Sequence, residues 1–169
     1  MKQLFIALIC LPLASLAQDC PLKKEVDKFS QEPRLSTGFM SFNEGGHATL
    51  LSLDADAKEI NLLFSLKRTG ESPCFDEEST AVITYEGKAS KSTFRNSGAM
   101  NCNGIFQVTF KNVPTTPSIL QRLATQKITS ITLTGTPKPI IITLDSDQQQ
   151  TFSSRANCLI TEAKSLIKK

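Results

Sequence analysis

The segment Lys58–Arg68, which reads KEINLLFSLKR, decides the fold class of this chain. Large apolar residues stand at every second position in it: Ile60, Leu62, Phe64 and Leu66. Because successive side chains of a β-strand point to opposite faces of its sheet, this period of two places all of them on one face. The segment therefore predicts a half-buried strand that gives one face to a core.

The segments on both sides have the same strand-like texture. RLSTGFMSFN (34–43) and HATLLSLDA (47–55) flank Gly45-Gly46, which predicts a hairpin. GIFQVTFKN (104–112) alternates phenylalanine and valine with polar residues. Further strands are expected in TAVITYEG (80–87), in the more polar SKSTFRN (90–96) nearer a sheet edge, and in the β-branched KITSITLTG (127–135) and KPIIITL (138–144). The Gly-, Pro-, Ser- and acid-rich segment 69–79 predicts a loop.

Two short segments favour helices instead. Cys20–Ser30, CPLKKEVDKFS, has Leu22, Val26 and Phe29 at helical spacing, which predicts a short amphipathic helix. Ser118 is expected to cap a second short helix that carries apolar residues at 119, 120 and 123.

The C-terminal segment predicts the longest helix. Ser146 and Gln149 fit a capping box, and Asp145 and Asp147 suit the positive end of the helix dipole. Apolar residues then recur every three or four positions: Phe152, Ala156, Leu159, Ile160, Ala163, Leu166 and Ile167. A helix of about twenty residues with one apolar stripe must pack on a sheet. The expected fold class is α+β: mainly antiparallel sheet, with a sandwich as one arrangement, and a long C-terminal helix packed on it.

The first residues, MKQLFIALICLPLASLAQDC, resemble an export signal. Lys2 precedes an apolar run, and Ser15-Leu16-Ala17 places small residues where a signal peptidase cuts, so cleavage is expected before Gln18. Neither Cys10 nor Cys20 follows the small residue that lipoprotein processing requires. We therefore expect a signal peptide at 1–17, one globular domain at 18–169, and a periplasmic or secreted protein without a transmembrane segment after cleavage.

The charge balance disfavours a nucleic-acid partner. One of the 19 basic residues, Lys2, leaves with the signal, so 18 basic side chains face 16 acidic ones. The charges are scattered and form no basic stripe interleaved with aromatic residues, which nucleic-acid binding would need.

The expected mature chain keeps four cysteines, Cys20, Cys74, Cys102 and Cys158, which predicts two disulfides in an oxidising compartment. Three connectivities are possible. Cys74 lies shortly before the predicted strand that begins at Thr80, and Cys102 shortly before the one that begins at Ile105, whereas Cys20 and Cys158 belong to the two predicted terminal helices. We favour Cys74–Cys102 and Cys20–Cys158.

No constellation in the sequence predicts catalysis, a cofactor or a metal. Cys102 lacks a base for nucleophilic work except His47, the single histidine, which lies at a predicted hairpin tip. There is no Gly-x-Ser-x-Gly, no phosphate-binding glycine loop and no CxxC pair. The acid pairs Asp54/Asp56 and Glu77/Glu78 fall in turns and loops, where acids are common because they are solvated.

Sugar-binding proteins usually present flat aromatic side chains on their surface, and this sequence does not show such residues. The chain has no Trp, one Tyr at position 85 inside a predicted strand, and ten Phe that mostly fall at core-facing positions.

The chain resembles a group of small exported proteins of Bacteroidota-type bacteria. The resemblance lies in the signal ending SLA-Q, in DAKEINLLFSL, NCNGIFQVTFKN and LQRLATQKITSITLTG, and in the Cys-bearing terminal helix, and it covers nearly the whole mature chain. These proteins have no assigned activity, so the resemblance implies an envelope or secreted location and no catalytic residue.

The expected function is that of an exported, non-catalytic binding or structural protein whose partner is a protein or an envelope component. One alternative is a hydrolase of envelope or dietary polymers whose acidic groups assemble only in the folded chain. Another is a carrier with an apolar pocket between helix and sheet. An apolar cavity would favour the carrier, and convergent carboxylates would favour the hydrolase.

Overall fold

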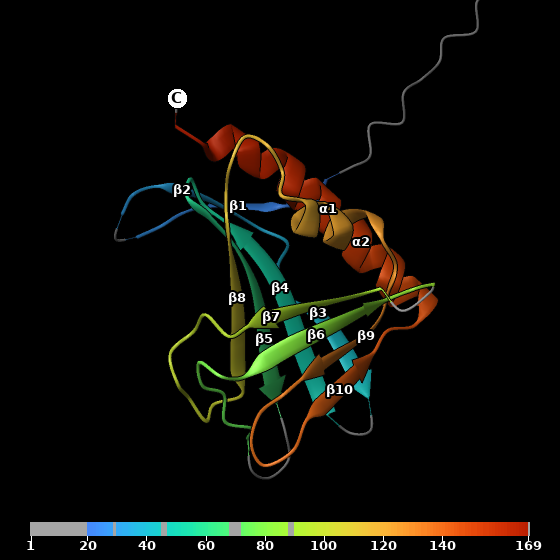
Figure 1. Cartoon of the computed structure of the whole chain (residues 1–169). Helices are drawn as coiled ribbons and strands as arrows, with labels where there is room; N and C mark the ends of the chain where they lie inside the picture. The colour runs from blue at the N-terminus through green and yellow to red at the C-terminus, as the bar shows by residue number, and fades with distance from the viewer. Residues whose placement is uncertain (1–19, 29, 45–46, 68–71, 88–89, 169) are drawn as a thin grey trace, which may run out of the picture.

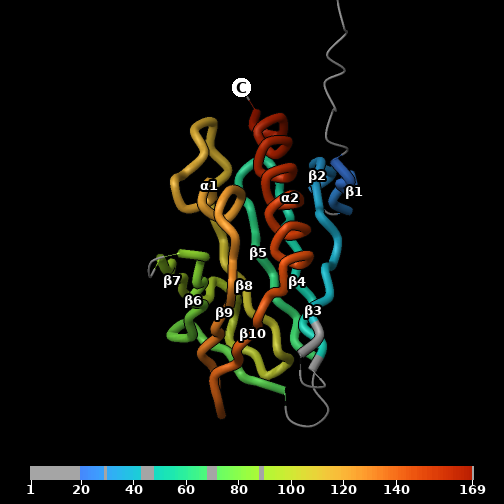
Figure 2. The backbone as a smooth tube through the Cα atoms, turned by 90° about the vertical axis from the view of Figure 1, so that its right-hand side faces the viewer, coloured from blue at the N-terminus to red at the C-terminus, as the bar shows by residue number. Residues whose placement is uncertain are grey.

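Two antiparallel β-sheets face each other in the computed structural model, which describes residues 20–28, 30–44, 47–67, 72–87 and 90–168 (Figure 1). The larger sheet contains β1 (Lys23–Val26), β2 (Pro33–Ser36), β3 (Met40–Glu44), β4 (His47–Ala55), β5 (Glu59–Lys67) and β8 (Ile105–Lys111). The smaller sheet contains β10 (Ile140–Thr143), β9 (Ile128–Leu133), β6 (Thr80–Tyr85) and β7 (Lys91–Arg95), in that order. Figure 2, turned by 90°, shows the two sheets as separate layers.

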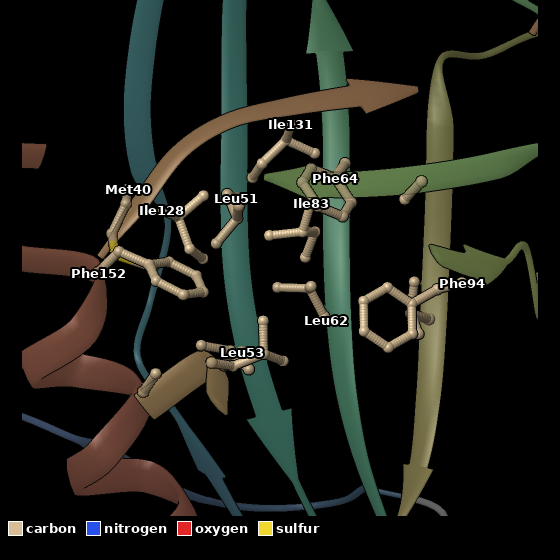
Figure 3. Close-up of a cluster of buried hydrophobic side chains, with 14 of the residues drawn as sticks. Met40, Leu51, Leu53, Leu62, Phe64, Ile83, Phe94, Ile128, Ile131 and Phe152 are labelled. Carbon is tan, nitrogen blue, oxygen red and sulfur yellow. The ribbon is translucent and has the colours of Figure 1, made fainter. Parts of the chain in front are cut away.

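The strand β5 confirms the alternation seen in the sequence. Ile60, Leu62, Phe64 and Leu66 are each at most 3% exposed, and the residues between them are half-buried. β5 lies between β4 and β8 and pairs antiparallel with both. Its buried face meets the inner face of the smaller sheet, where Figure 3 shows Ile83 and other apolar side chains between the crossing strands.

The helices complete the core at one end of the sandwich. They are α1 (Ser118–Thr125), α2 (Ser146–Ala163) and the 3₁₀ turn η1 (Lys164–Leu166). α2 packs on β2 and β4 and runs beside α1. It buries Phe152, Ala156, Leu159, Ile160 and Ala163, which are five members of the predicted apolar stripe. The predicted α+β class, with mainly antiparallel sheet and a C-terminal helix packed on it, is confirmed.

The predicted N-terminal helix is wrong. Residues Lys23–Val26 form β1, an edge strand with all of its side chains exposed, which pairs antiparallel with β2. The spacing of Leu22 and Val26 suggested a buried helical stripe, but Val26 is 59% exposed. Pairing with β2 gives this short segment backbone hydrogen bonds, which four residues could not make as an isolated helix.

Both predicted helix caps are displaced by one residue. α1 begins at Ser118, but its cap position is Pro117, and no side chain caps it. In α2 the cap is Asp145, which accepts from the backbone N–H of Gln148, while the Gln148 side chain accepts from the Asp145 N–H. The predicted capping box is present, but Asp145 takes the cap position that was expected of Ser146.

Both predicted disulfides are present, Cys20–Cys158 and Cys74–Cys102. They are consistent with an oxidising, extracytoplasmic compartment. Of the helices among the described residues, none has the length and apolar character needed to cross a bilayer. The predicted signal peptide at 1–17 and the Gly45-Gly46 turn lie outside the described residues, as does the side chain of His47.

Candidate functional site: a groove beside the C-terminal helix

Among the phenylalanines that the structure describes, one lies on the outside of the molecule. Phe39 is 58% exposed in the connection between β2 and β3, whereas Met40 and Phe42 are 6% and 4% exposed. The alternation of the extended chain explains the difference, because it turns Met40 and Phe42 toward the core and Phe39 away from it. Gly38, at φ +66°, precedes Phe39 and supplies the left-handed backbone that this connection uses.

The helix α2 forms the wall opposite Phe39. Asp147, Thr151 and Arg155 stand four residues apart along it, so they follow one another on one side of the helix. The Arg155 guanidinium donates from Nη1 to the Thr37 carbonyl oxygen at 3.2 Å. This bond ties the helix to the strand connection two residues before Phe39, so the two walls have a fixed relation.

Two adjoining cavities lie along this wall, and together we call them the Phe39 groove. The first, of about 320 Å³, is lined by Phe39, Asp145 and Gln148 among others, and the second, of about 410 Å³, by Pro21, Gln150 and Ser154. Asp147, Thr151 and Arg155 line both cavities. Volumes of this size lie at the lower end of the range for small-molecule sites.

A disulfide holds the far end of the groove. Cys20 is bonded to Cys158, and Pro21, the next residue, lines the second cavity. Cys158 lies on the same helix as Arg155, less than one turn further on. The covalent link therefore places Pro21 against the helix and gives this N-terminal segment a role in the shape of the groove.

The groove offers both hydrogen-bond donors and acceptors, and its charged groups are the carboxylates of Asp145 and Asp147 and the guanidinium of Arg155. Arg155 supplies a guanidinium with N–H groups beyond the one bonded to Thr37, and Asp147 supplies a carboxylate that has no hydrogen bond or ion pair within the described part of the chain. Thr151, Ser154 and Gln150 add hydroxyl and amide groups from the exposed side of α2. Such a set can bind a polar ligand, and the excess of one carboxylate disfavours an anionic one.

The acid pairs singled out in the sequence serve local structure. Asp54 accepts from the Ser52 hydroxyl at 2.9 Å, and Asp56 accepts from the backbone N–H groups of Lys58 and Glu59 in the turn before β5. Neither residue lines the Phe39 groove.

The loop before β6 is organised by another aspartate, Asp76. Its carboxylate accepts from the Ser79 hydroxyl at 2.8 Å and from the backbone N–H groups of Ser79 and Glu78. The Ser79 hydroxyl, helped by the backbone bonds, lowers the pKa of Asp76. Glu78 lies 4.0 Å from Arg95, and both side chains are about three-quarters exposed, so the Glu77/Glu78 pair belongs to the solvated surface.

A second polar cluster lies under the β6–β7 hairpin. Tyr85 is 2% exposed, and within the described residues neither its hydroxyl nor the nearby Ser90 hydroxyl has a hydrogen-bond partner. The Arg122 guanidinium lies 5.6 Å from the centre of the Tyr85 ring and donates to the Ser92 hydroxyl at 3.3 Å. Burial raises the pKa of Tyr85, and Ser92 and Arg122 offset that effect only in part.

The space between α1, α2 and β5 is filled. The cleft bordered by Ile60, Leu120 and Ile160 contains no volume that a water molecule could occupy. The apolar carrier function predicted a large cavity between helix and sheet, and this part of the described interface does not provide one.

Sequence reasoning missed Phe39 and Arg155. The available signal was the alternation of the extended segment, which places Phe39 on the face opposite to Met40 and Phe42. Arg155 carried no signal, because its role depends on where the helix lies relative to β2. Comparison of the chain with protein-family models, curated proteins and solved structures finds no match.

Proposed function

We propose that this is an exported binding protein of the periplasm or the secreted fraction, without catalytic activity, that holds an envelope or extracellular component in the Phe39 groove. The observation that carries the proposal is the exposed ring of Phe39 opposite Asp147, Thr151 and Arg155. A large aromatic side chain with more than half of its surface in water is a common mark of a binding site when polar groups converge beside it.

Two features support a binding role over the alternatives. Asp145, the second carboxylate of the groove, is engaged as the helix cap, and the four cysteines of the expected mature chain are joined in disulfides. The disulfides also agree with export, as does the resemblance to small exported bacterial proteins noted above.

The test is retention of envelope material on the immobilised mature protein, residues 18–169. Wild type is compared with Phe39→Ala and with Met100→Ala, which removes an equally apolar side chain that is 76% exposed and lies outside the groove. We expect the same envelope component to be retained by wild type and Met100→Ala and lost from Phe39→Ala. Equal retention by all three proteins would show that the groove is not the binding site.

A further inference from the structure

We infer that the ligand of the Phe39 groove is a neutral oligosaccharide, with one sugar ring stacked on Phe39 and its hydroxyls hydrogen-bonded by α2. This inference rests on the proposed function and specifies the class of ligand.

The ring of Phe39 is the stacking surface. The face of an aromatic ring carries partial negative charge, which attracts the polarised C–H groups on the flat side of a pyranose. Large exposed apolar side chains elsewhere in the described chain are Val26, Met100 and Ile141, and none of them lines either cavity of the groove. Among the residues that line the groove, Phe39 is therefore the one large apolar side chain that is mostly exposed, and polar groups of α2 lie beside it.

The polar groups match sugar hydroxyls, which both donate and accept. Thr151, Ser154 and Gln150 can also do both. Asp147 accepts and Arg155 donates, and both of these charged groups form strong hydrogen bonds to hydroxyls. Asp147 and Arg155, which line both cavities, carry opposite charges, and Asp145 adds a second carboxylate to the first cavity, so the groove disfavours an anionic ligand.

The dimensions favour more than one ring. Asp147 and Arg155 are eight residues apart on a helix, which is about 12 Å along its axis. The cavities of about 320 and 410 Å³ adjoin along this stretch, since Asp147, Thr151 and Arg155 line both. A chain of two or three sugar units can extend from Phe39 past Thr151 toward Pro21.

A peptide fits these features less well. Peptides that lie in grooves usually add a strand to an open sheet edge or insert apolar side chains into pockets. Met40 and Phe42, the other large apolar residues of this segment, border the first cavity but are only 6% and 4% exposed, so they offer little apolar surface to a peptide side chain. Stacking on one ring with hydrogen bonds around it is the mode of binding that the groove allows.

The experiment is titration of the mature protein with maltotriose, cellotriose and triacetylchitotriose, followed by calorimetry and by NMR signals of the Phe39 ring. Wild type, Phe39→Trp, Phe39→Ala and Met100→Ala are compared. We expect saturable binding of at least one trisaccharide to wild type, binding retained by Phe39→Trp and Met100→Ala, and affinity about tenfold lower in Phe39→Ala. Absence of binding by all three sugars, or equal affinity of wild type and Phe39→Ala, would overturn the inference.

The same proteins separate this inference from the proposed function. If Phe39-dependent retention of envelope material survives protease treatment of that material and is competed by the bound trisaccharide, both stand. If retention depends on Phe39 but is abolished by protease, and no trisaccharide binds, the groove binds a protein and only the glycan inference fails. If neither retention of envelope material nor trisaccharide binding depends on Phe39, both the proposed function and the glycan inference are wrong. Hydrolysis of a trisaccharide during the titration would contradict the non-catalytic role.

Discussion

Asn112, which directly follows β8, donates from its side-chain amide to the carbonyl oxygen of Ala163, the last residue of α2, at 2.8 Å. The same amide donates to the Asp56 carbonyl oxygen at 2.8 Å, and the Asn112 backbone N–H donates to the Lys58 carbonyl oxygen at 2.7 Å. The last carbonyls of a helix have no partner within it, so Asn112 satisfies one of them and joins the helix end to the sheet. Asn112 and Ala163 are 7% and 0% exposed.

Asn112→Ala should therefore destabilise the fold. Two carbonyls lose their side-chain donor in a buried place, at a cost of about 1–3 kcal/mol for an unsatisfied group. Urea unfolding followed by circular dichroism measures this as a lower midpoint. The matched control is Asn103→Ala at an exposed position, where a change within about 0.5 kcal/mol is expected. Equal midpoints for the two variants would contradict the role of Asn112.

Gly104 stands where the chain passes closest to β5. Its φ is +72°, and a Cβ there would lie 2.6 Å from the Leu66 carbonyl oxygen. Gly87 also has a positive φ, +97°, but a Cβ on it would meet nothing within 4 Å. Gly87→Ala should lose about 1–2 kcal/mol from its backbone conformation, whereas Gly104→Ala should lose clearly more because the strand must also shift. Thermal unfolding of the two variants side by side measures the difference, and equal losses would contradict the close approach.

The strands were predictable because their signal is local. In β5, and equally in β8, the period of two is set by burial of one face, and burial follows directly from side-chain type. The helix predicted over Cys20–Ser30 was wrong for the opposite reason. The apolar spacing of this segment fits a helix, but Lys23–Val26 pairs with β2, and the local sequence does not encode that pairing. The Phe39 groove depends on the same kind of long-range placement, because Arg155 meets Thr37 across 118 residues.

Both pairings were predicted correctly, with Cys20 and Cys158 assigned to the two terminal segments and Cys74 and Cys102 to the segments before two strands, although Cys20 precedes the strand β1 and not a helix. On the loop-entropy model, loss of Cys74–Cys102, with a separation of 28, costs about 3.5 kcal/mol, and loss of Cys20–Cys158, with a separation of 138, costs about 5 kcal/mol. We expect the double variant Cys20→Ser/Cys158→Ser to lose more stability in urea than Cys74→Ser/Cys102→Ser. Non-reducing peptide mapping checks the pairing itself, and a free thiol at Cys102 in the exported protein would refute it.

The position of the α2 cap can be tested by alanine substitution at two neighbouring residues. Asp145 accepts from the Gln148 N–H at 2.8 Å, so Asp145→Ala should lower stability by about 1 kcal/mol. Ser146 is the first helical residue and is exposed, so Ser146→Ala should change the stability of the fold little. Thermal unfolding compares the two. A larger loss for Ser146→Ala would restore the serine as the cap.

Tyr85 gives a pH-dependent prediction because it is the single tyrosine of the chain. Burial raises its pKa above the ordinary value of 10.0, so the folded state holds the phenol proton more tightly than the unfolded state. The stabilising effect is fully present below pH 10 and is lost as the pH rises through the folded-state pKa, since the unfolded chain then ionises first. Phenolate absorbance should therefore titrate above 10.0 in the native protein and near 10 in denaturant.

Tyr85→Phe isolates the hydroxyl. It removes a buried group that has no hydrogen-bond partner among the residues the structure describes, so stability at neutral pH should stay equal or rise. Above pH 10 the variant should lose less stability with each further rise in pH than wild type, because no phenol remains to ionise on unfolding. Urea midpoints at pH 7 and at pH 10.5 (about half a unit above the ordinary pKa of tyrosine) measure both effects. A loss of stability in Tyr85→Phe at neutral pH would mean that the hydroxyl makes a hydrogen bond that holds β6 to its surroundings.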